Sequence, residues 1–263
     1  MVVWSSLLRS PSTFQFFSNL HCNLLAAISL QFQLTLGDYF KENQAGAKTA
    51  EEATNLLGWL LGHQRVRAIF DEAQALRNHG TVLTYLVANL TRWTTHYTAF
   101  RRLLDLKTPI RHAVVLSRND IIGAQVGAEH NQGKRRKLSD AANSQCDIIE
   151  SAEFWNQLQT VVDDIEPICY GTNINQSDKT RPDQVLLTFA GIFLHFDRHS
   201  DQSVAAGMRK RLEKRWKALD QPMFIFALIL NPYERLDRFG DKAGVNVFSL
   251  NTLLIDVRGL LRH

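Results

Sequence analysis

The sequence predicts a mainly α-helical protein. Apolar residues recur every three or four positions over most of the chain, and the alternation typical of a strand is limited to residues 28–36. The chain has 263 residues, of which 45% are hydrophobic and 21% charged, so it is long enough and apolar enough to bury a core. We therefore expect helices over residues 50–117 and 150–230, with little strand content.

Five helices are expected in the first half of the chain, after a segment at 28–36 that fits either a half-buried strand or the start of a helix. Thr49 is suited to cap the first helix, which ends near Gly62. The second ends before Asn78-His79-Gly80, because a glycine directly after a helix favours the left-handed conformation of a C-terminal cap. The other three follow apolar runs at residues 83–90, 93–104 and 110–116.

A polar stretch rich in Gly, Asn, Ser and Ala divides the chain at residues 124–146, and we expect it to be poorly ordered. Helices are expected again after it, at residues 154–170, 182–198, 203–219 and 223–230. The predicted organisation is a divergent N-terminal segment (1–45), a first helical part (46–120), a basic flexible linker (121–149) and a second helical part (150–263).

Composition limits the function only loosely. The net charge of +4 and the pI of about 9.0 permit a nucleic-acid partner without demonstrating one. The three cysteines, Cys22, Cys146 and Cys169, are too few and too scattered for a disulfide framework or a four-ligand zinc site, and they fit a reducing compartment. No membrane span is expected, because no run approaches roughly 20 apolar residues.

Six short sequence segments, taken in order, resemble the hAT superfamily of DNA transposases, most closely the transposase-like proteins of fungal genomes. They lie between about residues 30 and 235, at 37–41, 90–97, 154–167, 183–189, 213–216 and 228–232. The resemblance implies a ribonuclease-H-like catalytic core with three acids that bind Mg²⁺, interrupted by an all-α insertion domain. This chain would then be the helical insertion domain, with a degraded edge of the catalytic core at its N-terminus.

Departures from the family pattern argue against catalysis. The Cys and His of the family's C-x-x-H element, which follows the first two acids, align with Ala27 and Leu30, and residues 1–37 contain neither Asp nor Glu. The family's C-terminal glutamate motif, in the segment that mediates dimerisation, has no counterpart after Pro232. Acids elsewhere, such as Asp163, Asp164 and Glu166, are expected on a solvated helix face. We therefore expect no enzymatic activity, no bound cofactor, and no oligomer formed through that segment.

Three groups of residues are candidate DNA contacts. The indole of Trp93 could stack on an unpaired base, with Arg92 and His96 beside it, or it could be a core residue of its helix. The basic run in the predicted linker could bind phosphate or direct nuclear import, or be a solvated charge run. The basic helix near residue 210 could contact backbone phosphates with its solvent-facing bases, or be ordinary surface. The basic residues of these two groups are Lys134, Arg135, Arg136 and Lys137, and Arg209, Lys210, Arg211, Lys214 and Arg215.

The function expected from these patterns is non-catalytic DNA binding by a remnant of a hAT transposase, located in the nucleus or otherwise in the cytoplasm. A structural or protein-interaction role, or a pseudogene product without a selected activity, is the alternative. An active transposase or nuclease is the third possibility, and the missing acids disfavour it.

Overall fold

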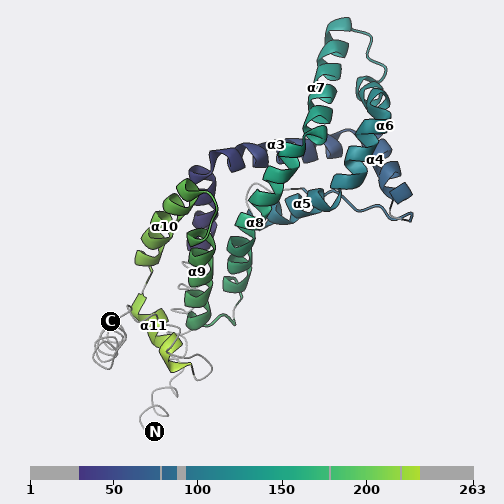
Figure 1. Cartoon of the computed structure of the whole chain (residues 1–263). Coiled ribbons are helices and arrows are strands. Elements are labelled where there is room, and N and C mark those ends of the chain that lie inside the picture. The colour runs from purple at the N-terminus through teal and green to yellow at the C-terminus, as the bar shows by residue number, and fades with distance from the viewer. Residues whose placement is uncertain (1–29, 78, 88–92, 178, 220, 232–263) are drawn as a thin grey trace. The chain divides into compact units, whose positions relative to one another are not determined.

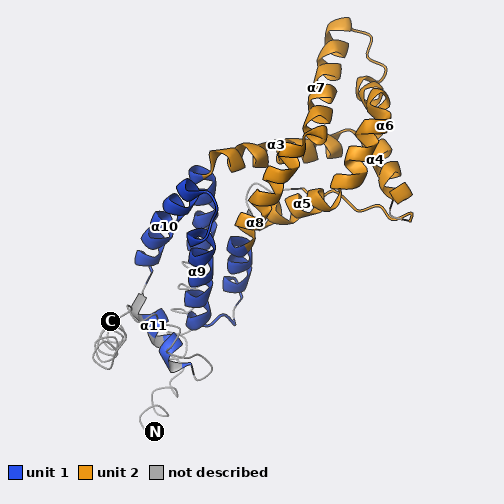
Figure 2. Cartoon of the chain, in the orientation of Figure 1, with its two compact units in different colours: residues 1–42, 167–263 blue, residues 43–166 orange. Residues whose placement is uncertain are grey.

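The computed structural model describes residues 30–77, 79–87, 93–177, 179–219 and 221–231, and within them it is helical with no strand (Figure 1). The prediction of a mainly α-helical chain is therefore confirmed. The chain divides into two compact units (Figure 2). Unit 2 is residues 43–166, and unit 1 joins residues 1–42 to residues 167–263. The predicted division at 121–149 thus falls inside one unit, and the expectations for residues 1–29 and beyond 231 lie outside the described residues.

The described residues of unit 2 form five complete helices and the beginning of a sixth. α6 packs against both α4 and α7 (Figure 1). The unit's helices are α3 (Gln44–Gly62), α4 (Gln64–Arg77), α5 (Trp93–Asp105), α6 (Lys107–Val126), α7 (Gln132–Glu150) and the first part of α8 (Ala152–Asn175).

α3 begins earlier than the sequence predicts. Asn43, and not Thr49, is its N-cap, since the Asn43 side chain accepts a hydrogen bond of 2.7 Å from the backbone N–H of Gly46. Thr49 lies one turn inside the helix, where its hydroxyl bonds the carbonyl of Ala45 and the side chain of Gln157. The predicted end at Gly62 is confirmed.

The predicted helix at residues 83–90 is wrong over its described part. Residues 81–87 are not helical, and residues 88–90 lie outside the described residues. The buried amide of Gln74 on α4 holds this segment: it accepts from the backbone N–H of Leu83 at 3.0 Å and donates to the hydroxyl of Tyr85 at 2.9 Å. The turn before it begins as expected, with Gly80 at φ 86° and its N–H bonded to the carbonyl of Ala75.

The poorly ordered linker expected at residues 124–146 is also wrong. α6 continues to Val126, and the whole of α7 follows after a short connection. The side chain of Asn131 caps α7, and Ala142, Cys146 and Ile149 are buried at helical spacing. Small residues form most of this stripe, so the segment looks polar in composition although one face of it is apolar.

Unit 1 is built around aromatic contacts between residues 30–42, which form a helix, and α9 (Pro182–Asp197). Phe32 lies 4.6 Å from Phe189, and Tyr39 lies 5.9 Å from Phe196, between ring centroids. Helix is therefore the correct alternative for residues 30–36. The other helices in the described part of the unit are the last part of α8, α10 (Gln202–Lys217) and α11 (Gln221–Leu230), close to the ranges that the sequence predicts.

None of the helices in the described ranges is long and apolar enough to cross a membrane.

Candidate nucleic-acid interface

Of the three basic or aromatic groups that the sequence singles out, the one on α10 departs most from expectation. We expected its bases to face solvent, but all three arginines of the helix form ion pairs inside unit 1. Arg215 lies 2.7 Å and Arg211 3.7 Å from the carboxylate of Asp38, and Arg211 also bonds Glu42 at 2.8 Å. Arg209 lies 2.9 Å from Asp197. These arginines hold the unit together.

The pairing follows from matched helical spacing. Asp38 and Glu42 lie four residues apart on the helix at 30–42, as do Arg211 and Arg215 on α10, so that two acids face two bases. Asp38 is only 3% exposed, and a buried carboxylate needs such partners because it has lost its hydration. Gly207 permits the close approach, since a Cβ there would lie 2.3 Å from an oxygen of Glu42. The lysines of this helix, Lys210, Lys214 and Lys217, remain exposed.

The run Lys134, Arg135, Arg136 and Lys137 has a different setting. It occupies the first two turns of α7, and all four side chains are exposed. Figure 1 shows this end of α7 at the tip of the α6–α7 pair, away from α3 and α8. The nearest ion pair is to Asp140, at 4.0 Å between two exposed side chains, which contributes little stability. Because α7 begins here, the positive end of its dipole adds to the potential of the four cations.

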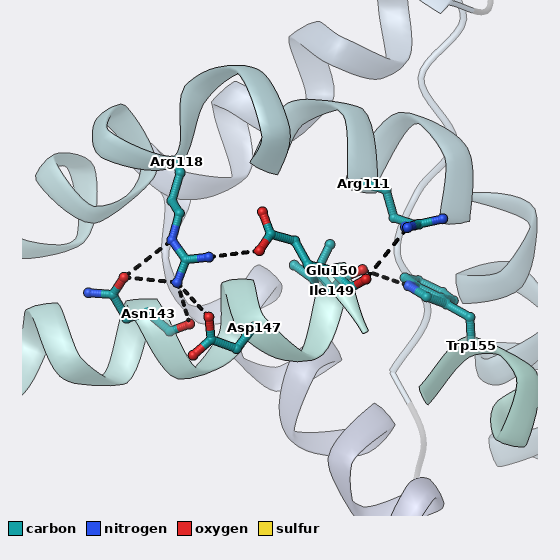
Figure 3. A network of polar contacts seen from close by, with 7 residues as sticks. All are labelled: Arg111, Arg118, Asn143, Asp147, Ile149, Glu150 and Trp155. Carbon is teal, nitrogen blue, oxygen red and sulfur yellow. Dashed lines mark hydrogen bonds and ion pairs between the residues drawn. The ribbon is translucent and has the colours of Figure 1, made fainter. Parts of the chain in front are cut away.

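The other end of α7 is fixed by a polar network (Figure 3). Arg118 reaches from α6 to α7, where it donates to the side chain of Asn143 at 3.0 Å, Asp147 at 2.6 Å and Glu150 at 2.9 Å. The indole N–H of Trp155 donates to the carbonyl of Ile149 at 2.7 Å. These contacts fix the C-terminal half of α7, and the N-terminal half with its four cations projects from it.

The candidates on α5 are only partly described. Arg92 and the side chain of Trp93, for which the sequence allows base stacking or core packing, lie outside the described residues. His96 is a core residue: it is 7% exposed and packs edge-on against Phe100. Burial lowers the pKa of His96 below its usual value, which keeps the ring neutral at pH 7. The burial of His96 therefore contradicts the prediction that its side chain contacts DNA.

A fourth basic group was missed by the sequence analysis. Arg77 at the end of α4 and the first turns of α6 line a pocket of about 270 Å³. The described lining residues are all basic except Thr108 and Val115; the basic ones are Arg77, Lys107, Arg111 and His112. The spacing of Lys107 and Arg111 was visible in the sequence, but nothing there indicated that Arg77, thirty positions earlier, would join them.

The described residues hold no group of three or more His, Cys, Asp or Glu side chains that could bind a metal ion. The acids expected on a solvated face of α8 are divided, because Asp163 is exposed whereas Asp164 is 3% exposed and Glu166 accepts a hydrogen bond from Tyr97. Burial raises the pKa of Cys146 to about 11, so its thiol is protonated at neutral pH and is a poor nucleophile or ligand.

No protein-family model, curated protein or solved structure matches this chain.

Proposed function

We propose that this chain is a non-catalytic DNA-binding remnant of a hAT-type transposase, and that it contacts DNA through the start of α7. The observation that carries the proposal is the set of four consecutive, exposed cations at the projecting N-terminus of that helix. The same run would serve as a nuclear-import signal. The family ancestry rests on the ordered sequence segments alone.

The expected mode of binding is independent of DNA sequence. Successive residues of a helix point about 100° apart, so four consecutive bases surround the helix end and do not form one reading face. Long, exposed Lys and Arg side chains of this kind neutralise backbone phosphates and release counterions. Base-specific readout would need side chains held at a groove edge.

The leading test compares two triple variants that each remove three exposed positive charges. One replaces Lys134, Arg135 and Lys137 with Ala, and the control replaces Lys210, Lys214 and Lys217. If the proposal is right, the α7 variant lowers the slope of log K against log salt by about 2.7, since each phosphate contact contributes about 0.9. The α10 variant should change the slope little, because Lys214 and Lys217 lie at the negative end of their helix dipole, next to Glu213.

The measurement is fluorescence anisotropy of a labelled duplex from low to moderate salt. If the slope of log K against log salt falls equally in the two variants, net charge alone, and not the position of α7, drives binding. Absence of binding by the unaltered chain would overturn the proposal.

Catalysis is tested separately. We expect no cleavage or joining of hairpin or duplex DNA with Mg²⁺ or Mn²⁺, because the three acids of the family pattern lack counterparts in the sequence. Metal-dependent nicking by the purified chain, lost on replacing one of its acids, would contradict this.

A protein-interaction role is the second candidate, and a feature of unit 1 favours it. α9 and α10 line a groove of about 420 Å³ whose walls are apolar apart from Glu213. Leu194 at this groove is 48% exposed, although aliphatic side chains of this size are usually buried. Loss of a bound protein when Leu194 is replaced by Glu, with DNA binding unchanged, would favour this alternative.

A further inference from the structure

The pocket between α4 and α6 gathers positive charge without acids to balance it. Its four basic side chains come from two helices, Arg77 from the last turn of α4 and the others from the first turns of α6. Lys107 and Arg111 are four residues apart on one helix, where like charges repel each other. None of the described residues that line the pocket is acidic.

The start of α6 adds to this positive potential. Its N-cap, Leu106, offers no side-chain hydrogen bond, and its first turn contains no acidic residue. The positive end of the first segment of α6, which runs up to the non-helical backbone at Ser117, therefore lies beside the same basic side chains. On α10, by contrast, the arginines face acids of the same unit.

Two of the basic side chains are partly engaged. The Lys107 ammonium lies 6.0 Å from the ring centroid of Trp155, and one Arg111 nitrogen lies 3.5 Å from the carbonyl of Glu150. A guanidinium has five N–H donors, so this single long contact leaves most of the donors of Arg111 available. Trp155 is fully buried and thereby fixes where the lysine stem lies.

We infer that this pocket binds a phosphate monoester, taken either from the 5′ end of a nucleic-acid strand or from a free phosphorylated small molecule. A monoester carries about −1.5 to −2 charges and three acceptor oxygens at pH 7, which suits several convergent cations better than a singly charged phosphodiester does. The volume of about 270 Å³ is enough for a phosphate group and lies below the 300–1,000 Å³ typical of pockets that bury larger ligands.

The test uses the full chain and two blunt DNA duplexes that differ only in a 5′-phosphate or a 5′-hydroxyl. The phosphorylated duplex should bind about tenfold more tightly, the size of one or two charge-assisted hydrogen bonds. Replacing Arg77 and His112 with Ala should abolish this preference while leaving affinity for the 5′-hydroxyl duplex unchanged. These two are chosen because Lys107 also lies over the buried ring of Trp155 and Arg111 also bonds the carbonyl of Glu150.

A second measurement identifies the source of the phosphate. Sodium phosphate, compared with sodium chloride at equal ionic strength, should shift the backbone amide resonances of the first turn of α6, and the double variant should lose those shifts. If phosphate shifts these amides but the two duplexes bind equally, the pocket takes free phosphorylated molecules. If neither effect occurs, the inference is wrong.

The inference stands independently of DNA binding through α7. The Lys134, Arg135 and Lys137 triple variant should lose affinity for both duplexes and keep the phosphate-induced shifts. If the chain binds DNA without any preference for a 5′-phosphate and without these shifts, the proposed function stands and the inferred phosphate site is wrong.

Discussion

α7 and α10 carry similar runs of basic residues and use them in different ways. On α10, Arg209, Arg211 and Arg215 are bound to acids of the same unit. On α7, the run from Lys134 to Lys137 surrounds an exposed helix start, with one weak pair to Asp140. The comparison teaches that a count of bases on a helix does not tell whether they bind a ligand or hold the fold.

The two helices differ because of where their partner acids lie. Glu42 pairs with Arg211 across 169 residues of sequence, so no local pattern on α10 reveals the contact. The bases of α7 have no such partner among the described residues beyond Asp140, and the hydrogen bonds from Arg118 that fix the helix lie toward its other end.

The largest expected effect separates two neighbours on α10. Replacing Arg215 with Ala should lower the free energy of unfolding by about 3 kcal/mol, because it leaves the buried carboxylate of Asp38 with weaker partners. Replacing Lys214, which is exposed, should change it by less than about 0.5 kcal/mol. Urea denaturation measures both, and equal effects would contradict the structural role of the α10 arginines.

The next effect concerns the polar network of Arg118, which fixes the C-terminal half of α7. Replacing Arg118 with Ala should cost about 1–2 kcal/mol, less than the buried pair because Asp147 is 66% and Glu150 41% exposed. It should also weaken DNA binding slightly, since the basic end of α7 would be less well positioned. Arg101→Ala on α5, an exposed arginine, is the control. Unchanged stability would mean that the network of Figure 3 does not fix the helix.

The two units should also differ in how they respond to acid. Burial lowers the pKa of His96 in unit 2, so its contribution to stability is complete above its usual 6.5 and is lost as the pH falls below it. In unit 1, burial would raise the pKa of Asp183, but hydrogen bonds from Arg181 and Asn231 outweigh it and lower the pKa below 3.8. The stability from Asp183 is therefore retained above about pH 4 and lost only at lower pH.

The variants His96→Gln and Asp183→Asn test this difference by urea denaturation at several pH values. The first should reduce the loss of stability between pH 7 and about pH 5, and the second should reduce it only below about pH 4. If both variants show the same dependence of stability on pH, His96 and Asp183 are not the groups that make the two units differ.

The smallest effect is expected at Asp140. Replacing it with Asn should change stability by less than about 0.5 kcal/mol, since both partners of its pair are exposed. DNA binding should nevertheless become slightly tighter, because the acid nearest the run is removed. Weaker binding would mean that Asp140 positions Arg136 and does not merely compete for it.

Much of the helical fold followed from the sequence, whereas little of the candidate interface did. α9 and α10 were predicted to within a residue or two because large apolar side chains mark their buried faces. α7 was missed because Ala142 and Cys146 form a buried stripe that composition does not reveal. The apolar spacing at residues 83–90 predicts a helix, but the hydrogen bonds of Leu83 and Tyr85 with Gln74 decide the conformation of the described part of this segment. The α4–α6 pocket could not be predicted, because it combines Arg77 with residues of another helix that lie thirty or more positions later in the sequence.

The division of unit 1 into two stretches has a consequence for synthesis of the chain. The helix at residues 30–42 leaves the ribosome well before Phe189 and Phe196, on which Phe32 and Tyr39 pack. At 5–20 residues per second the interval is roughly 10 to 30 s. Unit 2 is translated entirely within it. During that time Phe32, Leu36 and Tyr39 lack the surfaces that bury them, which makes this short helix the part of the newly made chain that a chaperone would be expected to hold.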